Sequence, residues 1–198
     1  RSVIAKRKRR CRRAGVPVGD DLVQREFTAD RIDQKWLVDI TEHWTGEGRL
    51  YMCAFKDVCS NRIVGYAIGR RMKASLAVRA LKNALEQRGY PEGVIVHSDR
   101  GGQFRSRSFQ QTLTRYNLRG SMGRVGACGD NAAMESFFSL LQKNVLDRQP
   151  WATREELRLA IVHWVEARYH RKRRQRRLGK LTPIEFETIM MDAVTLAA

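Results

Sequence analysis

The pattern of apolar residues changes near residue 70, and this change limits the fold more than any other feature of the sequence. Before it, residues 35–41, 50–58 and 62–68 are rich in aromatic and β-branched residues, which predicts three strands. Gly46-Glu47-Gly48 and Ser60-Asn61 are short turn sequences between these segments. The three strands are therefore expected to form an antiparallel meander.

After residue 70 the pattern becomes helical. Apolar residues between Ala74 and Arg88 follow one face of a helix, and Gly89 stands where that helix should end. Residues 94–97 form a short apolar run that fits a buried strand. Because a helix precedes this run, we expect a crossover connection and a strand parallel to its neighbour.

Further helices are predicted over residues 109–116 and 131–146, from a capping box at Thr153 towards Tyr169, and after Pro183. Residues 121–129 are glycine-rich and are expected to form a mobile loop. The order of these elements indicates an α/β fold in which helices flank a mixed sheet.

The chain carries a formal net charge of +17, and most of the excess lies in two segments. Residues 1–13 and residues 168–180 each contain eight Lys or Arg and no acid. Dense basic segments of this kind bind polyanions, which here favours nucleic acid over a membrane. A charged tail that only keeps the protein in solution is the alternative for each segment.

The cysteines Cys11, Cys53, Cys59 and Cys128 lack the paired spacing of a zinc site and are expected to be reduced structural thiols. The sequence has neither an apolar stretch long enough for a bilayer nor the apolar run of a signal peptide, so we expect a cytoplasmic protein. It begins with Arg1 rather than Met, which predicts a fragment or a processed product.

Three acidic residues lie in surroundings otherwise suited to burial. Asp39 is inside the first predicted strand, and Asp99 directly follows the run at 94–97. Glu135 lies among large apolar residues in the helix predicted after the glycine-rich segment. An unpaired buried carboxylate is unfavourable, so acids at such positions require a cation.

Magnesium suits such a set of oxygen ligands. It binds through a few carboxylates together with substrate phosphate, and two Mg²⁺ ions about 4 Å apart can hold the attacking and leaving oxygens of phosphoryl transfer. Glycines after Asp99 allow the backbone to approach a phosphate closely. By themselves, these residues indicate a polyanion-binding domain or a metal-dependent nuclease.

The segments around the acids resemble the three catalytic blocks of integrase-core (DDE) transposases, and most of all the second-frame proteins of the insertion-sequence-3 family. The 35 residues between Asp99 and Glu135 match the spacing that this family shares with retroviral integrases. The likeness extends over about residues 22–190. The matching blocks are Lys35-Trp36-Leu37-Val38-Asp39-Ile40-Thr41, His97-Ser98-Asp99-Arg100-Gly101-Gly102-Gln103-Phe104 and Asp130-Asn131-Ala132-Ala133-Met134-Glu135-Ser136-Phe137-Phe138.

This resemblance implies a ribonuclease-H-like fold with a mixed five-stranded sheet, in which Asp39, Asp99 and Glu135 bind two Mg²⁺ ions, with Mn²⁺ as a substitute. The implied activity is metal-dependent DNA cleavage at insertion-sequence ends, followed by strand transfer into target DNA. The resemblance also implies a homo-oligomer on DNA, no membrane contact, and a bacterial cytoplasmic protein associated with the nucleoid when it binds DNA.

On the same basis we expect three regions. Residues 1–30 form a basic arm left from a larger N-terminal region, residues 31–150 the catalytic core, and residues 151–198 a helical and basic extension that completes it. The expected DNA contacts, mostly to phosphate, are Arg100, Gln103, Arg124, Lys143, Arg168, Arg171 and Arg174.

The sequence departs from the family pattern in its helix and in its C-terminal signature. Gln142 stands where the family has a lysine that touches DNA in integrases, with Lys143 as the alternative for that contact. His170, Gln175 and Arg176-Arg177 replace the usual signature residues. Two alternatives stay open: a related nuclease that only hydrolyses DNA, and a non-catalytic DNA-binding remnant.

Overall fold

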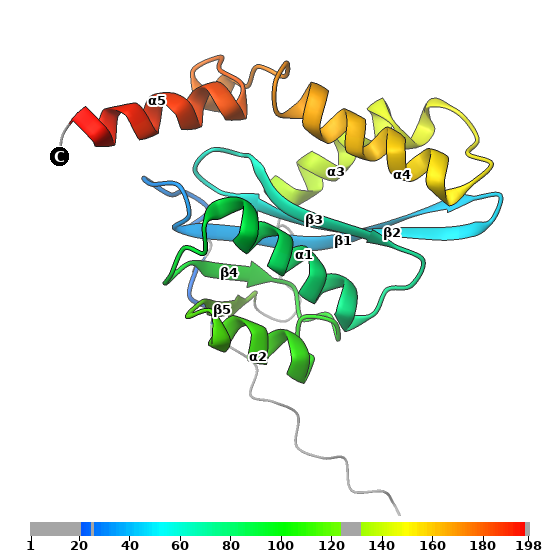
Figure 1. Ribbon diagram of the computed structural model, residues 1–198, viewed down its shortest axis with the longest axis horizontal. Helices are drawn as coiled ribbons and strands as arrows, with labels where there is room; N and C mark the ends of the chain where they lie inside the picture. The colour runs from blue at the N-terminus through cyan, green and yellow to red at the C-terminus, as the bar shows by residue number, and fades with distance from the viewer. Residues whose placement is uncertain (1–20, 25, 124–131, 197–198) are drawn as a thin grey trace, which may run out of the picture.

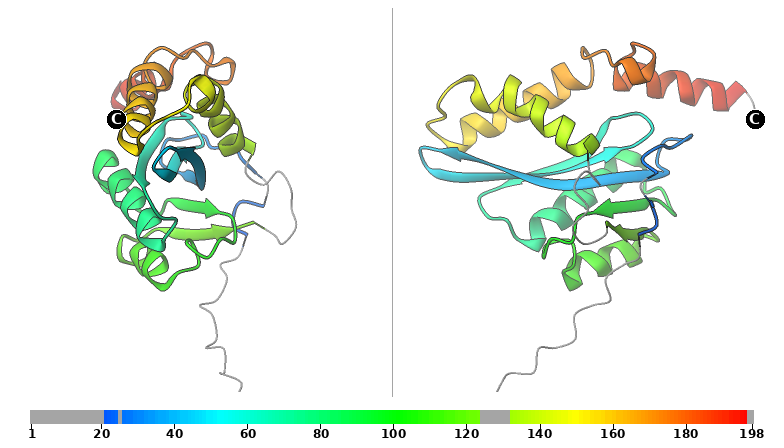
Figure 2. Two further views of the ribbon diagram at one scale, coloured as in Figure 1. Left: turned by 90° about the vertical axis from the view of Figure 1, so that its right-hand side faces the viewer. Right: turned by 180° about the vertical axis from the view of Figure 1, so that it is seen from behind.

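The computed structural model describes residues 21–24, 26–123 and 132–196, which build a five-stranded sheet with helices on both faces (Figures 1 and 2). β1 (Lys35–Thr45), β2 (Gly48–Asp57) and β3 (Ile63–Gly69) form the predicted antiparallel meander. β4 (Ile95–Ser98) pairs in parallel with β1, and β5 (Arg119–Met122) pairs in parallel with β4. The strand order is β3-β2-β1-β4-β5, which confirms the predicted mixed sheet.

One face of the sheet is covered by α1 (Ala74–Arg88) and α2 (Arg107–Arg115). The predicted apolar stripe of α1 is buried, and Gly89 ends the helix in the left-handed conformation with φ of 69°. Trp36 and Phe55 from the sheet and Phe109 from α2 lie in the same core. The crossover through α1 therefore makes β4 parallel to β1, as expected.

The opposite face is covered by α3 (Ala132–Asn144) and α4 (Arg154–His163). The capping box predicted at the start of α4 is present, with Thr153 and Glu156 each bonding the other's backbone N–H. After α4 the helix widens into a π-helical turn, Trp164–Tyr169, whose aromatic rings pack on Phe137 of α3. This second core connects the C-terminal region to the sheet.

The prediction of a mobile loop over residues 121–129 is wrong at its start. Ser121 and Met122 are buried and belong to β5, where Ser98 of β4 pairs with Met122. The residues of β5 have little strand preference of their own, so its conformation comes from hydrogen bonding to β4. Residues 124–131 lie outside the described part of the chain.

α5 (Pro183–Leu196) follows a 3₁₀ turn at Arg176–Leu178 and extends away from the body of the molecule (Figure 1). It begins after Thr182, as the Thr-Pro sequence predicts. Within the described ranges no helix has the length and apolar character needed to cross a bilayer.

Candidate active site

Asp39 lies on β1 opposite Ala54 of β2. Side chains two apart on a strand share a face, so Asp39 faces the same side as Leu37, which belongs to the core under α3. The side chain is half-buried, and its Oδ1 accepts a hydrogen bond of 2.7 Å from the backbone N–H of Ile40. A carboxylate is thus held on the sheet at the edge of the α3 core.

Asp99 comes to the same edge through the parallel pairing of β1 and β4. Leu37 pairs with His97, and Asp39 and Asp99 each lie two residues beyond that pair. The Asp99 carboxylate accepts a hydrogen bond of 2.9 Å from the backbone N–H of Gly101. A Cβ at Gly101 would stand only 2.9 Å from Asp99 Oδ1, so a larger residue there would make the Asp99 carboxylate shift.

Glu135 lies in the first turn of α3, whose buried Met134 and Phe137 attach the helix to the sheet. Burial raises the pKa of Asp39 to about 6; the Ile40 hydrogen bond opposes this shift, and the negative charges of Asp99 and Glu135 add to it. The three acids predicted from the sequence therefore interact electrostatically across β1, the end of β4 and α3.

The expectation that all three acids lie in buried surroundings is wrong, because Asp99 and Glu135 are exposed. Three carboxylates that repel one another fit a divalent cation chemically. Among the described residues, however, no group of three or more His, Cys, Asp or Glu side chains is gathered closely enough to hold a metal ion. The three carboxylates are the type of ligand that Mg²⁺ prefers, but in this structure they lie too far apart to bind one ion together.

The residues expected to contact DNA do not all lie together. Arg100 is exposed, and its Nε donates to the oxygen of Gly123 at 2.8 Å, across the ends of β4 and β5. Lys143 and Arg171 are exposed. Arg174 donates to the Lys180 oxygen and pairs with Glu185 at 3.3 Å, so it is already engaged within the chain.

The remaining candidates are divided between the loop that follows β4 and the C-terminal region. Gln103 Nε2 lies 3.5 Å from the oxygen of Met72. Arg168 is exposed and lines a cavity of about 200 Å³ together with Lys172 and Arg173. Arg124 lies outside the described residues.

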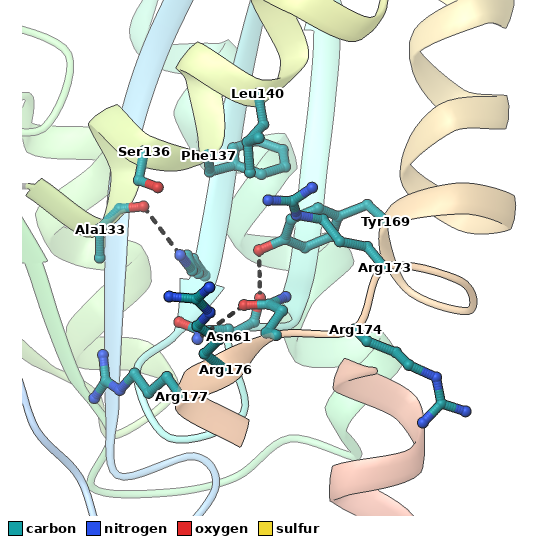
Figure 3. Close-up of a pocket in the computed structure, with 12 residues that line it drawn as sticks. Asn61, Ala133, Ser136, Phe137, Leu140, Tyr169, Arg173, Arg174, Arg176 and Arg177 are labelled. Atoms are coloured by element: carbon teal, nitrogen blue, oxygen red, sulfur yellow. Dashed lines mark hydrogen bonds between the residues drawn. The ribbon is translucent and has the colours of Figure 1, made fainter. Parts of the chain in front are cut away.

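A larger cleft, of about 490 Å³, lies between α3 and residues 173–177 (Figure 3). Figure 3 shows Arg173, Arg176 and Arg177 around it, whereas Arg174 is directed away from them. Lys56 lies at its base, with its ammonium donating to the Ala133 oxygen at 3.0 Å. Burial, and to a smaller extent the charge of Arg177, lower the pKa of Lys56 to about 8.

Four of the residues around this cleft were not predicted as site residues from the sequence: Lys56, Arg173, Arg176 and Arg177. A signal for Lys56 was available, since it is a charged residue inside an otherwise apolar strand, as Asp39 is. Gln142, which stands at the family's lysine position, contacts the Asp147 carboxylate through its amide. His170 is buried and accepts a hydrogen bond from the backbone N–H of Ile63 at 3.2 Å, which makes it a structural residue.

Comparison with known proteins identifies the family. Two models described as "Integrase core domain" match, one over residues 29–128 and one over residues 116–183. The chain is 42% identical over 173 residues to the transposase InsF for insertion sequence IS3A of Escherichia coli (strain K12), covering 87% of this chain and 60% of that protein. It is 38% identical to an uncharacterized 31 kDa protein of insertion element IS600 from Shigella sonnei, covering 86% of this chain and 63% of that protein.

Solved structures share the fold. The catalytic core domain of HTLV-2 integrase in complex with magnesium, in its trimeric form, superposes with a TM-score of 0.61 at 15% identity, covering 78% of this chain and 95% of that one. A chain from the simian T-cell lymphotropic virus intasome in complex with PP2A regulatory subunit B56 gamma superposes with a TM-score of 0.59 at 18% identity, covering 74% of this chain and 51% of that one. The predicted ribonuclease-H-like fold is therefore confirmed.

The chain spans about 60% of the length of the InsF transposases that it matches. Three findings agree on the family of this chain: the matching family models, the sequence identity with the InsF proteins and the five-stranded sheet. The chain belongs to the integrase core domain family, among the relatives of the insertion-sequence-3 transposases.

Proposed function

We propose that this chain is the catalytic core of a transposase that cleaves DNA at the ends of an insertion sequence and joins those ends to target DNA. Asp39, Asp99 and Glu135 are the proposed ligands of two Mg²⁺ ions, which Mn²⁺ can replace. The observation that carries the proposal is the parallel pairing of β1 with β4, in which Asp39 and Asp99 each lie two residues beyond the Leu37–His97 pair, with Glu135 close enough to affect the pKa of Asp39.

The proposed chemistry needs little from the protein beyond position and charge. Bound divalent ions would supply positive charge opposite the attacking and leaving oxygens of the phosphodiester. In the proposed site, β1 and the turn after β4 carry two of the carboxylates, and the first turn of α3 carries the third. Water or a DNA 3′-hydroxyl serves as nucleophile, and the basic C-terminal segment binds the DNA backbone.

The proposal extends to the organisation of the chain. Residues 1–30 serve as a basic arm for DNA, residues 31–150 as the catalytic core, and residues 151–198 as the extension that completes it. Support for the last assignment comes from Leu157 and Ile161 of α4, which are buried in the same core as Leu37 of β1. A homo-oligomer on DNA, which would bring two element ends together, is part of the same proposal.

A cleavage assay tests this function. A labelled duplex is incubated with the protein and Mg²⁺ or Mn²⁺, beside Asp99→Asn and the control Asp192→Asn, whose carboxylate is exposed on α5. We expect metal-dependent nicking by the wild type and the control, and none by Asp99→Asn, which should still bind DNA. Cleavage that survives Asp99→Asn would contradict the assignment of the acids.

Two further outcomes separate the alternatives. Cleavage without joining to target DNA, when paired ends are supplied, would favour a nuclease that only hydrolyses. Salt-sensitive DNA binding without cleavage by any version of the full-length protein would favour a non-catalytic remnant.

A further inference from the structure

Lys56 is a buried cation for which the described residues supply no counter-charge. Only 5% of the residue is exposed, and its ammonium donates one hydrogen bond to a described residue, the Ala133 oxygen at 3.0 Å. Among the described residues no carboxylate lies within ion-pair distance of its ammonium. Lys35, which is also buried, differs in this respect, because it pairs with Glu26 at 3.7 Å. An ammonium has three donors, and buried charges are normally paired. Within the described part of the chain, Lys56 therefore has one hydrogen bond and no counter-charge.

The charged side chains that line the cleft above Lys56 are positive. Among the residues that the structure describes, those lining it include arginines at 173, 174, 176 and 177 and no Asp or Glu. Within the described structure, the side chains of Arg173 and Arg176 make no hydrogen bond or ion pair. Among the described residues, the buried Nε2 of Gln175, which also lines the cleft, makes no hydrogen bond of ordinary geometry, although the amide interacts with the Tyr169 hydroxyl. These groups are all donors, so the missing ligand is an acceptor that carries negative charge.

The cleft adjoins the proposed catalytic acids. Ala133 and Ser136, on either side of Glu135 in α3, both line it. On the sheet, Lys56 pairs with Leu37, and Asp39 lies two residues further along β1 on the same face. A ligand that reaches Lys56 is therefore close to the part of β1 that carries Asp39.

We propose that this cleft is a subsite for one phosphodiester of the DNA strand that passes the acidic residues, with Lys56 as its buried cation and Arg176 as a partner at its mouth. The proposal deepens the function proposed above, because it takes DNA as the ligand. Arginine and lysine together suit a phosphate, since the guanidinium fork and the ammonium both donate charge-assisted hydrogen bonds. A cleft of about 490 Å³ has room for a phosphate with its adjoining sugar.

The decisive variant is Lys56→Met, which keeps the length of the side chain and removes the charge. We expect it to fold at least as stably as the wild type, because the unpaired buried charge is gone, yet to bind a duplex about tenfold more weakly. The slope of log Kd against log salt should fall by about one. Lys82→Met, on the exposed side of α1 across the sheet, is the control and should change neither quantity.

A phosphate scan locates the contact. In duplexes that carry one neutral methylphosphonate each, one position near the cleaved bond should weaken binding to the wild type but not to Lys56→Met. Arg176→Ala should show the same loss of discrimination, while the control Arg115→Ala should behave as the wild type. If no position distinguishes wild type from Lys56→Met, or if Lys56→Met unfolds more easily and binds normally, the proposal is wrong and Lys56 is structural.

The scan is read by binding, so it does not depend on catalysis. A positive scan with an inactive protein would leave the subsite standing and reject the transposase activity. Cleavage by the protein together with a negative scan would support the transposase activity and reject the subsite. Inorganic pyrophosphate tests whether the cleft binds a free phosphate instead. The DNA assignment is overturned if pyrophosphate raises the unfolding temperature of the wild type but not of Lys56→Met, while both proteins bind DNA equally well.

Discussion

Arg88 and Glu187 form a buried ion pair, with Nη1 and Oε2 separated by 2.9 Å and only 4% and 3% of their side chains exposed. Arg88 is the last residue of α1, and Glu187 lies in the first half of α5. Glu187 also accepts hydrogen bonds from Arg62 at 2.6 Å and from Ser60 Oγ at 2.8 Å. The base of α5 is thereby joined to α1 and to the turn between β2 and β3.

Replacing Glu187 by Gln should destabilise the protein by about 2 kcal/mol, because Arg62 loses its counter-charge and Arg88 keeps only that of Asp33, at 2.8 Å. Urea unfolding measures the change. Glu185→Gln is a suitable comparison, since Glu185 pairs with Arg174 in exposed surroundings and its loss should be small. Equal effects of the two substitutions would show that burial of the Arg88 pair adds nothing.

The Arg88–Glu187 pair is also expected to make the free energy of unfolding depend on pH. Burial by itself raises the pKa of Glu187, but Arg88, Arg62 and Ser60 together lower it below the ordinary value of 4.5. Its contribution to stability is therefore present above pH 4.5 and is lost as the pH falls. The nearby Asp57 acts oppositely, because burial raises its pKa to about 6 and its contribution is lost as the pH rises from 3.8. The stability difference between wild type and Glu187→Gln isolates the first effect and should shrink below pH 4.5.

Asp39→Asn should not lower stability in the absence of metal, because it removes one of three carboxylates that repel one another. Added Mg²⁺ should raise the unfolding temperature of the wild type, since a ligand that binds only the folded state stabilises it, and should have little effect on the variant. Differential scanning fluorimetry over a Mg²⁺ series makes the measurement, with Asp192→Asn as control. The same Mg²⁺ response in wild type and Asp39→Asn would remove Asp39 from the ligand set.

Gly65 of β3 lies against α1 so closely that a Cβ there would stand 2.3 Å from the backbone nitrogen of Ala84. Gly65→Ala must therefore displace α1 from the sheet, at a cost of about 3 kcal/mol. Gly102→Ala is the matched control, because a Cβ at Gly102 meets nothing within 4 Å. Thermal unfolding of the two variants should separate them clearly, and similar stabilities would mean that α1 adjusts at little cost.

His170 connects the π-helical turn region to β3. Its Nε2 accepts from the backbone N–H of Ile63, and its Nδ1 lies 3.2 Å from a carboxylate oxygen of Glu166. His170→Ala leaves a buried N–H without an acceptor and opens a cavity, so we expect a loss of about 3 kcal/mol. DNA affinity, measured at a temperature where the variant is folded, should be unchanged. Weaker DNA binding by the folded variant would instead give His170 a role in the interface.

Much of the fold was predictable because its signals are local. The turn residues at 46–48 and the apolar stripe of α1 each specify an element without help from the rest of the chain, and both predictions are confirmed. The strand β5 has no such signal, since it is ordered by pairing with β4. The helix after Thr153 was predicted as one element, whereas its second half is a π-helical turn that buries Trp164 and Tyr169.

The residues of the site also differ in whether local sequence could reveal them. Asp39, Asp99 and Glu135 stood out through their local surroundings and their resemblance to the family blocks. The Lys56 cleft did not, because it is assembled from β2, α3 and residues 173–177, which lie far apart in the sequence.

The sequence alone thus determined the strand meander, α1 and the identity of the three acids, because these depend on short-range patterns of apolar, turn and acidic residues. Only the tertiary structure decided which charges are buried and which meet. The burial of Lys56 and the pairing of Arg88 with Glu187 depend on surfaces that exist once the sheet, α3 and α5 have packed together.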